Sequence, residues 1–214
     1  MKTSNPLRVR ARAIVHTLAR LYPDARCALD YGNPLELLIA TILSAQCTDV
    51  RVNMVTPALF ARFPDARAFA DANPHELERL IQSTGFFRAK AKNIQACCRQ
   101  LVEQHGGQVP ASLDELVKLP GVGRKTANVV LGDAFDVPGI TVDTHVGRLS
   151  RRLGLTKNVD PVKVERDLMK LLPSKHWVMF NHRMIYHGRQ VCHARNPRCG
   201  ECPLAASCVQ AGVA

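Results

Sequence analysis

The sequence is poor in aromatic residues and has no long apolar run. Aromatic side chains make up only 5% of the 214 residues, which argues against binding of single-stranded nucleic acid on aromatic platforms. No segment approaches the roughly 18 apolar residues that a membrane-spanning helix needs. The N-terminal residues also lack the apolar core of a signal peptide. We therefore expect a cytoplasmic protein that does not associate with a membrane.

Sustained alternation of apolar and polar residues, the pattern of half-buried strands, is also missing. Apolar residues instead recur at helical spacing in residues 35–43, 127–134 and 164–172. Asparagine or aspartate stands directly before proline at residues 33–34, 73–74 and 160–161, which is typical of a helix N-cap followed by proline at the first helical position. We predict an all-α, two-domain fold of roughly ten to twelve short helices.

Two further pairs of residues predict capping boxes, in which a polar side chain and a glutamate three positions later cap the helix reciprocally. The pairs are Asn73 with Glu76 and Ser112 with Glu115.

Acidic residues are outnumbered by basic ones, 18 to 29, which gives a formal net charge of +11. Such an excess is either a solvated basic surface or the footprint of a polyanion partner, because lysine and arginine supply most non-specific affinity for nucleic-acid phosphates. Charge alone does not decide between these readings.

Residues 113–130 have the pattern of a helix, a tight glycine turn and a second helix. Gly121 and Gly123, on either side of Val122, allow the backbone to approach a phosphate closely. The helix that begins at Arg124 points its N-terminal N–H groups the same way. A helix-hairpin-helix phosphate clamp is one interpretation, and an ordinary turn between helices is the other.

Lys125 and Asp143 are the candidate catalytic residues. Lys125 falls in the first turn of the second helix, where a cation opposes the helix dipole at a cost of about 0.3–1 kcal/mol. Such a placement favours phosphate contact or nucleophilic attack by an amine on a carbon. Asp143 follows an apolar stretch and precedes a helix, so taken alone it is an N-cap. Paired with Lys125, it becomes a candidate for catalysis.

Four of the eight cysteines gather near the C-terminus: Cys192, Cys199, Cys202 and Cys208. Their spacing suits a tetrahedral zinc or a [4Fe–4S] cluster equally well. Arg195 and Arg198 lie between the first two cysteines, where they either contact phosphate or are simply solvated.

Residues 36–40, 43–49, 119–130 and 142–145, together with the four cysteines, resemble the endonuclease III family of the helix-hairpin-helix glycosylase superfamily. The resemblance covers nearly the whole chain. It implies a helical barrel domain with the hairpin at residues 27–137, an iron–sulfur cluster domain at residues 1–26 and 138–214, and a lesion site between them. It also implies a [4Fe–4S] cofactor in place of zinc.

The resemblance further implies base-excision repair of oxidised pyrimidines in duplex DNA by a monomer. Lys125 would attack the sugar C1′ of the damaged nucleotide and, after losing the base, nick the abasic site by β-elimination. Asp143 would take a proton from the amine and stabilise positive charge on the sugar. The target nucleotide would be flipped out of the stack, as such enzymes do.

Three more residues match DNA-contacting positions of the family: Gln46, Phe86 and His145. Gln46 would fill the space that the flipped nucleotide leaves, and His145 would contact DNA near the active site. Phe86 would be the wedge that splits the opposite strand, although an aliphatic residue is more familiar there. A core aromatic is an equally good interpretation of Phe86.

Two alternatives stay open. A monofunctional mismatch or adenine-type glycosylase activates water with a carboxylate and commonly lacks a lysine at the position of Lys125. A non-catalytic helix-hairpin-helix DNA-binding protein needs neither Lys125 nor Asp143. The lysine favours the bifunctional glycosylase and abasic-site lyase.

Overall fold

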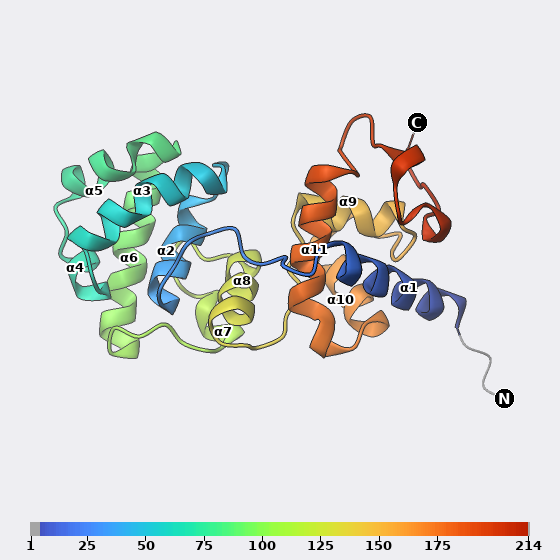
Figure 1. The fold of residues 1–214 in the computed structure, drawn as a ribbon. Coiled ribbons are helices and arrows are strands. Elements are labelled where there is room, and N and C mark those ends of the chain that lie inside the picture. The colour runs from blue at the N-terminus through green and yellow to red at the C-terminus, as the bar shows by residue number, and fades with distance from the viewer. Residues whose placement is uncertain (1–4, 214) are drawn as a thin grey trace. The chain divides into compact units, whose positions relative to one another are not determined.

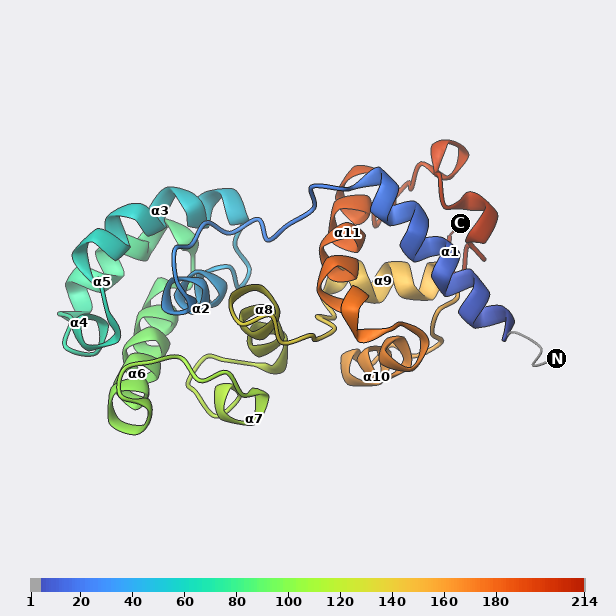
Figure 2. The same cartoon turned by 60° about the horizontal axis from the view of Figure 1, so that its bottom comes forward.

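The computed structural model describes residues 5–213 and is helical throughout, with no strand among these residues. The all-α prediction is confirmed. The chain divides into two compact units, which we call the central unit (residues 27–137) and the terminal unit (residues 5–26 and 138–213). Figures 1 and 2 show each unit as a bundle of short helices.

The central unit contains seven α-helices and one short 3₁₀ helix. Along the chain these are α2 (Pro34–Leu43), α3 (Asp49–Arg62), α4 (Ala66–Ala70), α5 (Pro74–Ile81), η1 (Gln82–Thr84), α6 (Phe87–His105), α7 (Leu113–Leu116) and α8 (Arg124–Ala134). Helix α6 packs against α2, α4 and α5, and α2 also packs against α8. Helix α2 is buried along nearly its whole length, from Leu37 to Leu43, so it is the centre of this core.

The terminal unit joins the N-terminal helix to the last third of the chain. Its elements are α1 (Pro6–Leu21), α9 (Thr144–Arg152), α10 (Pro161–Leu171), η2 (Ser174–His176), α11 (Trp177–Gln190), η3 (Cys199–Glu201) and η4 (Ala205–Ser207). Helix α11 packs against both α1 and α9, and α10 also packs against α1 and α9 (Figure 2). The core of this unit is separate from that of the central unit.

The helix starts follow the local sequence signals. Asn33, Asn73 and Asp160 each accept a hydrogen bond from a backbone N–H of the first turn, with proline at the first helical position. The capping box predicted at Ser112 is wrong, because the Ser112 side chain makes no capping bond and Glu115 pairs with Lys118. At Asn73 only half of the box forms, since the Glu76 carboxylate instead pairs with Arg62 at 2.6 Å.

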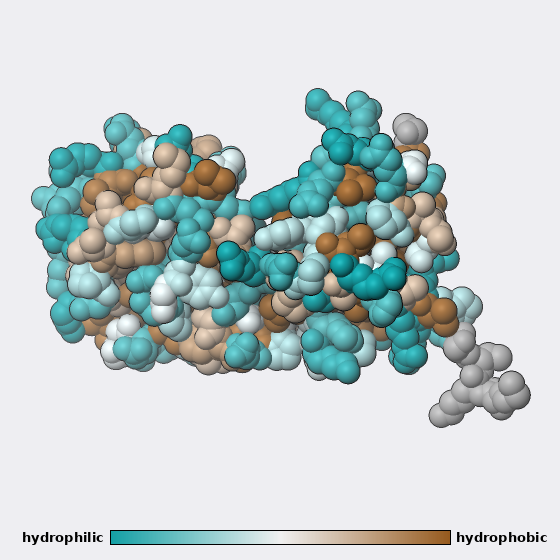
Figure 3. Space-filling view, viewed as in Figure 1, coloured by the Kyte–Doolittle hydropathy of each residue, from teal (hydrophilic) through white to brown (hydrophobic). Residues whose placement is uncertain are grey.

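No helix of the described residues is long and apolar enough to cross a membrane. The face drawn in Figure 3 is mostly hydrophilic and carries small, scattered apolar patches.

Candidate active site and iron–sulfur centre

The predicted hairpin is present as a tight turn between α7 and α8. Gly121 has φ +77°, a conformation that L side chains rarely adopt, and it lies so close to α6 that an added Cβ would come 2.9 Å from the Asn93 Cβ. The Val122 side chain is buried and its N–H donates to the Leu119 carbonyl at 3.1 Å, so Val122 anchors the turn. Gly123 is exposed and is the N-cap of α8, where no side chain caps the helix. The first N–H groups of α8 therefore suit a phosphate.

Lys125 is exposed in the first turn of α8, directly behind this turn. Arg124 is exposed beside it. A flexible side chain with a primary amine thus extends from a helix end that the hairpin fixes in place.

Asp143 is the N-cap of α9 in the terminal unit. Its Oδ1 accepts a hydrogen bond from the Val146 N–H at 2.7 Å, so the prediction that Asp143 caps a helix is confirmed. The carboxylate is half-buried and keeps further oxygen lone pairs for other partners.

His145 lies one residue into α9 and is half-buried. Burial lowers the pKa of its imidazole, which favours the neutral ring. Its ring lies against the Cα of Gly188 on α11, where an added Cβ would be 2.5 Å from the His145 Nδ1. Gly188 is therefore needed to seat this ring.

Gln46 and Phe86 share an unusual backbone conformation. Both are non-glycine residues with positive φ, +53° at Gln46 and +48° at Phe86, and both side chains are exposed. Phe86 is 67% exposed, so the interpretation of it as a core aromatic is wrong. A bulky residue in the left-handed region is a genuine outlier, and such outliers cluster at functional sites.

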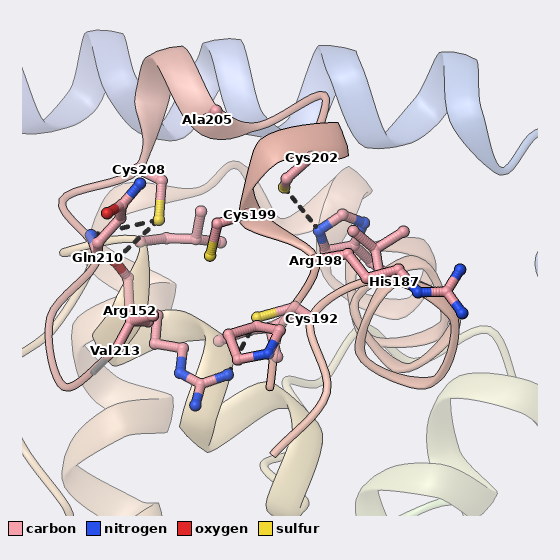
Figure 4. Close-up of a pocket in the computed structure, with 14 residues that line it drawn as sticks. Arg152, His187, Cys192, Arg198, Cys199, Cys202, Ala205, Cys208, Gln210 and Val213 are labelled. Carbon is pink, nitrogen blue, oxygen red and sulfur yellow. Dashed lines mark hydrogen bonds between the residues drawn. The ribbon is translucent and has the colours of Figure 1, made fainter. Parts of the chain in front are cut away.

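The four C-terminal cysteines converge on one cavity of the terminal unit (Figure 4). Cys192, Cys199, Cys202 and Cys208 line it from four points of a loop that includes η3 and η4. The remaining lining is largely apolar and includes Leu149, Leu153, Val191, Ala205 and Val213. Four thiols around a shared, apolar space fit an iron–sulfur cluster.

Hydrogen bonds from the protein also reach three of these sulfur atoms. Cys192 Sγ accepts from Arg152 Nη1 at 3.4 Å, and Cys208 Sγ accepts from the Gln210 N–H at 3.4 Å. Cys202 Sγ lies 3.4 Å from His187 Nε2. Donors of this kind stabilise thiolates and tune bound clusters. Burial raises the pKa of the Cys202 and Cys208 thiols, and both would have to be deprotonated to act as cluster ligands.

His187 is suited to donate to Cys202. Burial lowers the pKa of His187 to about 4, so its ring is neutral and carries one N–H. Its Nδ1 lies 3.0 Å from the Tyr22 hydroxyl. If the hydroxyl donates to Nδ1, the single ring proton is on Nε2 and points at the sulfur.

The other two predicted phosphate contacts, Arg195 and Arg198, are exposed in the loop between Cys192 and Cys199. The structure thus brings the cysteines and these arginines together in the terminal unit, and it places Gln46, Phe86, the hairpin and Lys125 in the central unit.

Sequence reasoning missed three residues that hold these loops, Lys90, Arg148 and Arg152. Lys90 is 5% exposed and bonds two backbone carbonyls of the central unit. Arg148 and Arg152 bond carbonyls around the start of the cysteine loop. The burial of Lys90 could have been predicted from the sequence, since Lys90 lies in phase with the apolar stripe of α6 that continues through Ile94 and Cys97.

Comparison with known proteins identifies the family. Residues 39–174 match the model of the "HhH-GPD superfamily base excision DNA repair protein", and residues 192–208 match the "iron-sulfur binding domain of endonuclease III". Endonuclease III of Synechocystis sp. is 62% identical over 94% of this chain and 93% of its own length. Endonuclease III of Bacillus subtilis is 50% identical over 88% of this chain and 86% of its own length.

The chain belongs to the endonuclease III family. Among solved structures, a non-covalent endonuclease III–DNA complex and a trapped endonuclease III–DNA covalent intermediate each superpose with a TM-score of 0.91 at 46% identity. Both cover 98% of this chain and 97% of the matched chain. The predictions of an endonuclease III-type repair enzyme and of a [4Fe–4S] cluster are confirmed, and zinc is no longer favoured.

Proposed function

We propose that this member of the endonuclease III family removes oxidised pyrimidines from duplex DNA and nicks the resulting abasic site, with Lys125 as the nucleophile and Asp143 as its acid–base partner. The observation that carries the assignment is an exposed lysine in the first turn of the helix that follows the glycine hairpin. The relative that was trapped as a covalent DNA intermediate is 46% identical to this chain. A covalent intermediate requires a nucleophilic side chain, and an amine is the one that forms a Schiff base with a sugar carbon.

The chemistry proceeds in four steps. The Lys125 amine forms a bond with the sugar C1′ as the bond from C1′ to the base breaks, and the base leaves with the electron pair and takes up a proton. Ring opening gives a Schiff base, and loss of a proton from C2′ then breaks the C3′–O bond and leaves a phosphate on the downstream strand. Water hydrolyses the Schiff base and frees Lys125.

Asp143 serves as the base that takes the proton from the attacking amine. Its ionised carboxylate also stabilises the positive charge that develops on the sugar as the base departs. Because Oδ1 caps α9, the carboxylate is held in one orientation while its other oxygen remains for this work.

DNA contacts complete the proposal. The Gly121–Gly123 backbone and the N-terminus of α8 bind phosphates, and Arg195 and Arg198 do the same from the cysteine loop. Gln46 fills the space of the flipped nucleotide and Phe86 separates the opposite strand. His145 contacts DNA beside Asp143. The four cysteines would hold the [4Fe–4S] cluster, which would stabilise the folded conformation of that loop.

Borohydride trapping on a duplex with a single abasic site tests this mechanism. We expect the native enzyme to form a covalent adduct and Lys125→Ala to form none, because alanine offers no amine. Lys118→Ala is the matched control, since Lys118 is an exposed lysine of the same unit that forms an ion pair with Glu115. Nicking by Lys125→Ala at the native rate would sink the assignment.

Asp143→Asn tests the second role without disturbing the helix. An asparagine oxygen caps a helix as well as an aspartate oxygen does, so α9 keeps its start and only the charge is lost. Turnover should fall by about 10²- to 10⁴-fold with DNA affinity retained. Base release without any trapped adduct in the native enzyme would point instead to a monofunctional glycosylase. The predictions of a cytoplasmic monomer stay predictions.

A further inference from the structure

A buried lysine of the central unit connects the two loops that present Gln46 and Phe86. Lys90 lies in the first turn of α6 and is only 5% exposed. Its Nζ donates to the Leu43 carbonyl at 2.8 Å and to the Thr84 carbonyl at 2.8 Å. One ammonium therefore ties together two segments that are about forty residues apart in the chain.

Both carbonyls lie at helix ends that lead directly into the exposed loops. Leu43 is the last residue of α2, three positions before Gln46. Thr84 is the last residue of η1, two positions before Phe86. Carbonyls at a helix C-terminus carry a partial negative charge, so a cation is favourable at the end of α2.

The loops themselves are strained. Gly85 has φ 70° and ψ 157°, a region that is essentially restricted to glycine, and Phe86 follows it in the left-handed region. Gln46 has a left-handed conformation as well. A non-glycine residue such as Gln46 or Phe86 is energetically costly in the left-handed region and persists there only where the surrounding structure fixes it. The bonds from Lys90 are a fixing element that both loops share.

Core packing alone does not call for an amine at this position. The buried stripe of α6 continues through Ala91, Ile94, Cys97 and Leu101, so an aliphatic side chain would fit the pattern. Burial lowers the pKa of Lys90, because the charged form is costly away from water. An apolar residue would pack at this position without the cost of burying a charge. We therefore attribute the presence of a lysine to its two hydrogen bonds.

We propose that Lys90 is a positioning residue that fixes the spacing between Gln46 and Phe86. Gln46 then fills the vacated space and Phe86 separates the opposite strand at the same time, as the target nucleotide leaves the stack. The inference rests on the proposed function of those two residues. Lys90 is buried, so it acts on DNA only through the loops that it holds. Its effect should therefore be confined to substrates whose bases must be separated.

Lys90→Met tests this, with Lys92→Met as the matched control. Lys92 is an exposed lysine of the same helix, so both variants lose one charge and gain the same side chain. Two substrates are compared under single turnover: an abasic site in a fully paired duplex, and the same site in a short unpaired bubble flanked by duplex. In the bubble the opposite strand needs no wedge and the stack leaves no gap to fill.

For Lys90→Met we expect a loss of about ten- to a hundredfold on the paired duplex, the scale expected when groups are displaced by about 1 Å. Trapping on the bubble should stay within about twofold of the native rate. A 2-aminopurine placed opposite the abasic site should show a smaller fluorescence rise on binding, since its unstacking depends on the wedge. Lys92→Met should match the native enzyme in all three measurements.

Equal losses on both substrates would overturn the proposal, because they would indicate general damage to the active site or fold. Unchanged rates on both would overturn it as well. If Lys90→Met does not fold, Lys90→Gln replaces it, since its amide N–H₂ still donates to one carbonyl, and the same selective loss is expected. If neither folds, Lys90 serves stability alone and the proposal is wrong. A native enzyme that gives no adduct on either substrate would instead refute the function itself.

Discussion

Helix α6 of the central unit and helix α9 of the terminal unit support exposed loops in related ways. On α6, Lys90 bonds the Leu43 and Thr84 carbonyls. On α9, Arg152 bonds the His193 carbonyl at 2.6 Å and the Ala194 carbonyl at 2.9 Å. Arg148, one turn earlier on α9, bonds the Cys192 carbonyl at 2.8 Å. In both units cationic side chains satisfy backbone acceptors that a loop would otherwise leave unpaired.

The two supports differ in what else holds the loop. The loops held by Lys90 begin at the ends of α2 and η1, so these helices, and not a cofactor, also fix the position of the loops. The loop held by the arginines contains all four cysteines and only two short 3₁₀ helices. We therefore expect the order of this loop to depend on the cluster as well as on the protein. The central unit should keep its loops when the cluster is lost, and the terminal unit should not.

Loss of a cluster ligand is the strongest test of that difference. In Cys202→Ser we expect the visible absorbance of the cluster to disappear and residues 192–213 to exchange amide hydrogens rapidly. Structural zinc sites contribute on the order of 10 kcal/mol to the folding of small domains, and a four-thiolate cluster should have a comparable effect on its loop. Hydrogen exchange at residues 44–48 and 84–90 should change little.

Cys27→Ser is the control for that experiment. Cys27 lies in the central unit, and burial raises its pKa to about 12, which keeps it a neutral thiol. This variant should keep the cluster. Equal loosening of both units in Cys202→Ser would contradict the comparison, because it would mean that the loops of the central unit also depend on the cluster.

Arg152→Met tests the protein's own share of the support for the cysteine loop. The substitution leaves the His193 and Ala194 carbonyls without this donor and removes a hydrogen bond to Cys192 Sγ. Hydrogen bonds to charged groups contribute about 1.5–3 kcal/mol each, so we expect the loss of the two carbonyl bonds to cost roughly 3–6 kcal/mol in urea unfolding and to speed loss of the cluster on storage.

Arg152→Lys should restore part of both properties, since one ammonium reaches fewer acceptors than a guanidinium. If Arg152→Met unfolded at the native urea concentration with its cluster intact, the cluster and Arg148 would hold the loop without any contribution from Arg152.

The sequence predicted the features of this molecule that depend on neighbouring residues. N-caps at Asn33, Asn73 and Asp160 follow from side chains two or three positions from the N–H groups that they bind. The predicted capping boxes are the exception, because Glu115 forms an ion pair with Lys118 and Glu76 forms one with Arg62. Local signals thus predict helix starts well, whereas a competing ion pair can remove the glutamate from a predicted capping box.

Features that depend on distant residues were not predicted. Lys90 gains its role from a carbonyl 47 positions away, and Arg152 from carbonyls 41 and 42 positions away. Phe86 was ambiguous because exposure depends on how the surrounding chain packs. The four cysteines were found because their spacing is local, whereas the arginine and histidine that reach their sulfur atoms come from other helices.

The smallest expected effect is a difference in stability between substitutions of the two hairpin glycines. Only Gly121 lies against Asn93 of α6. Gly121→Ala adds a Cβ 2.9 Å from the Asn93 Cβ at φ +77°, so we expect a loss of about 1–2 kcal/mol in thermal unfolding. Gly123→Ala adds a Cβ with no atom within 4 Å at an ordinary φ of −85°, so its stability should change by less than about 0.5 kcal/mol. Any weaker binding of Gly123→Ala to duplex DNA, measured over a salt titration, then reports the approach of a phosphate to the backbone. Equal destabilisation by both substitutions would show that the close contact of Gly121 with α6 does not fix the hairpin, in contrast to the hydrogen bonds by which α6 holds the Gln46 and Phe86 loops.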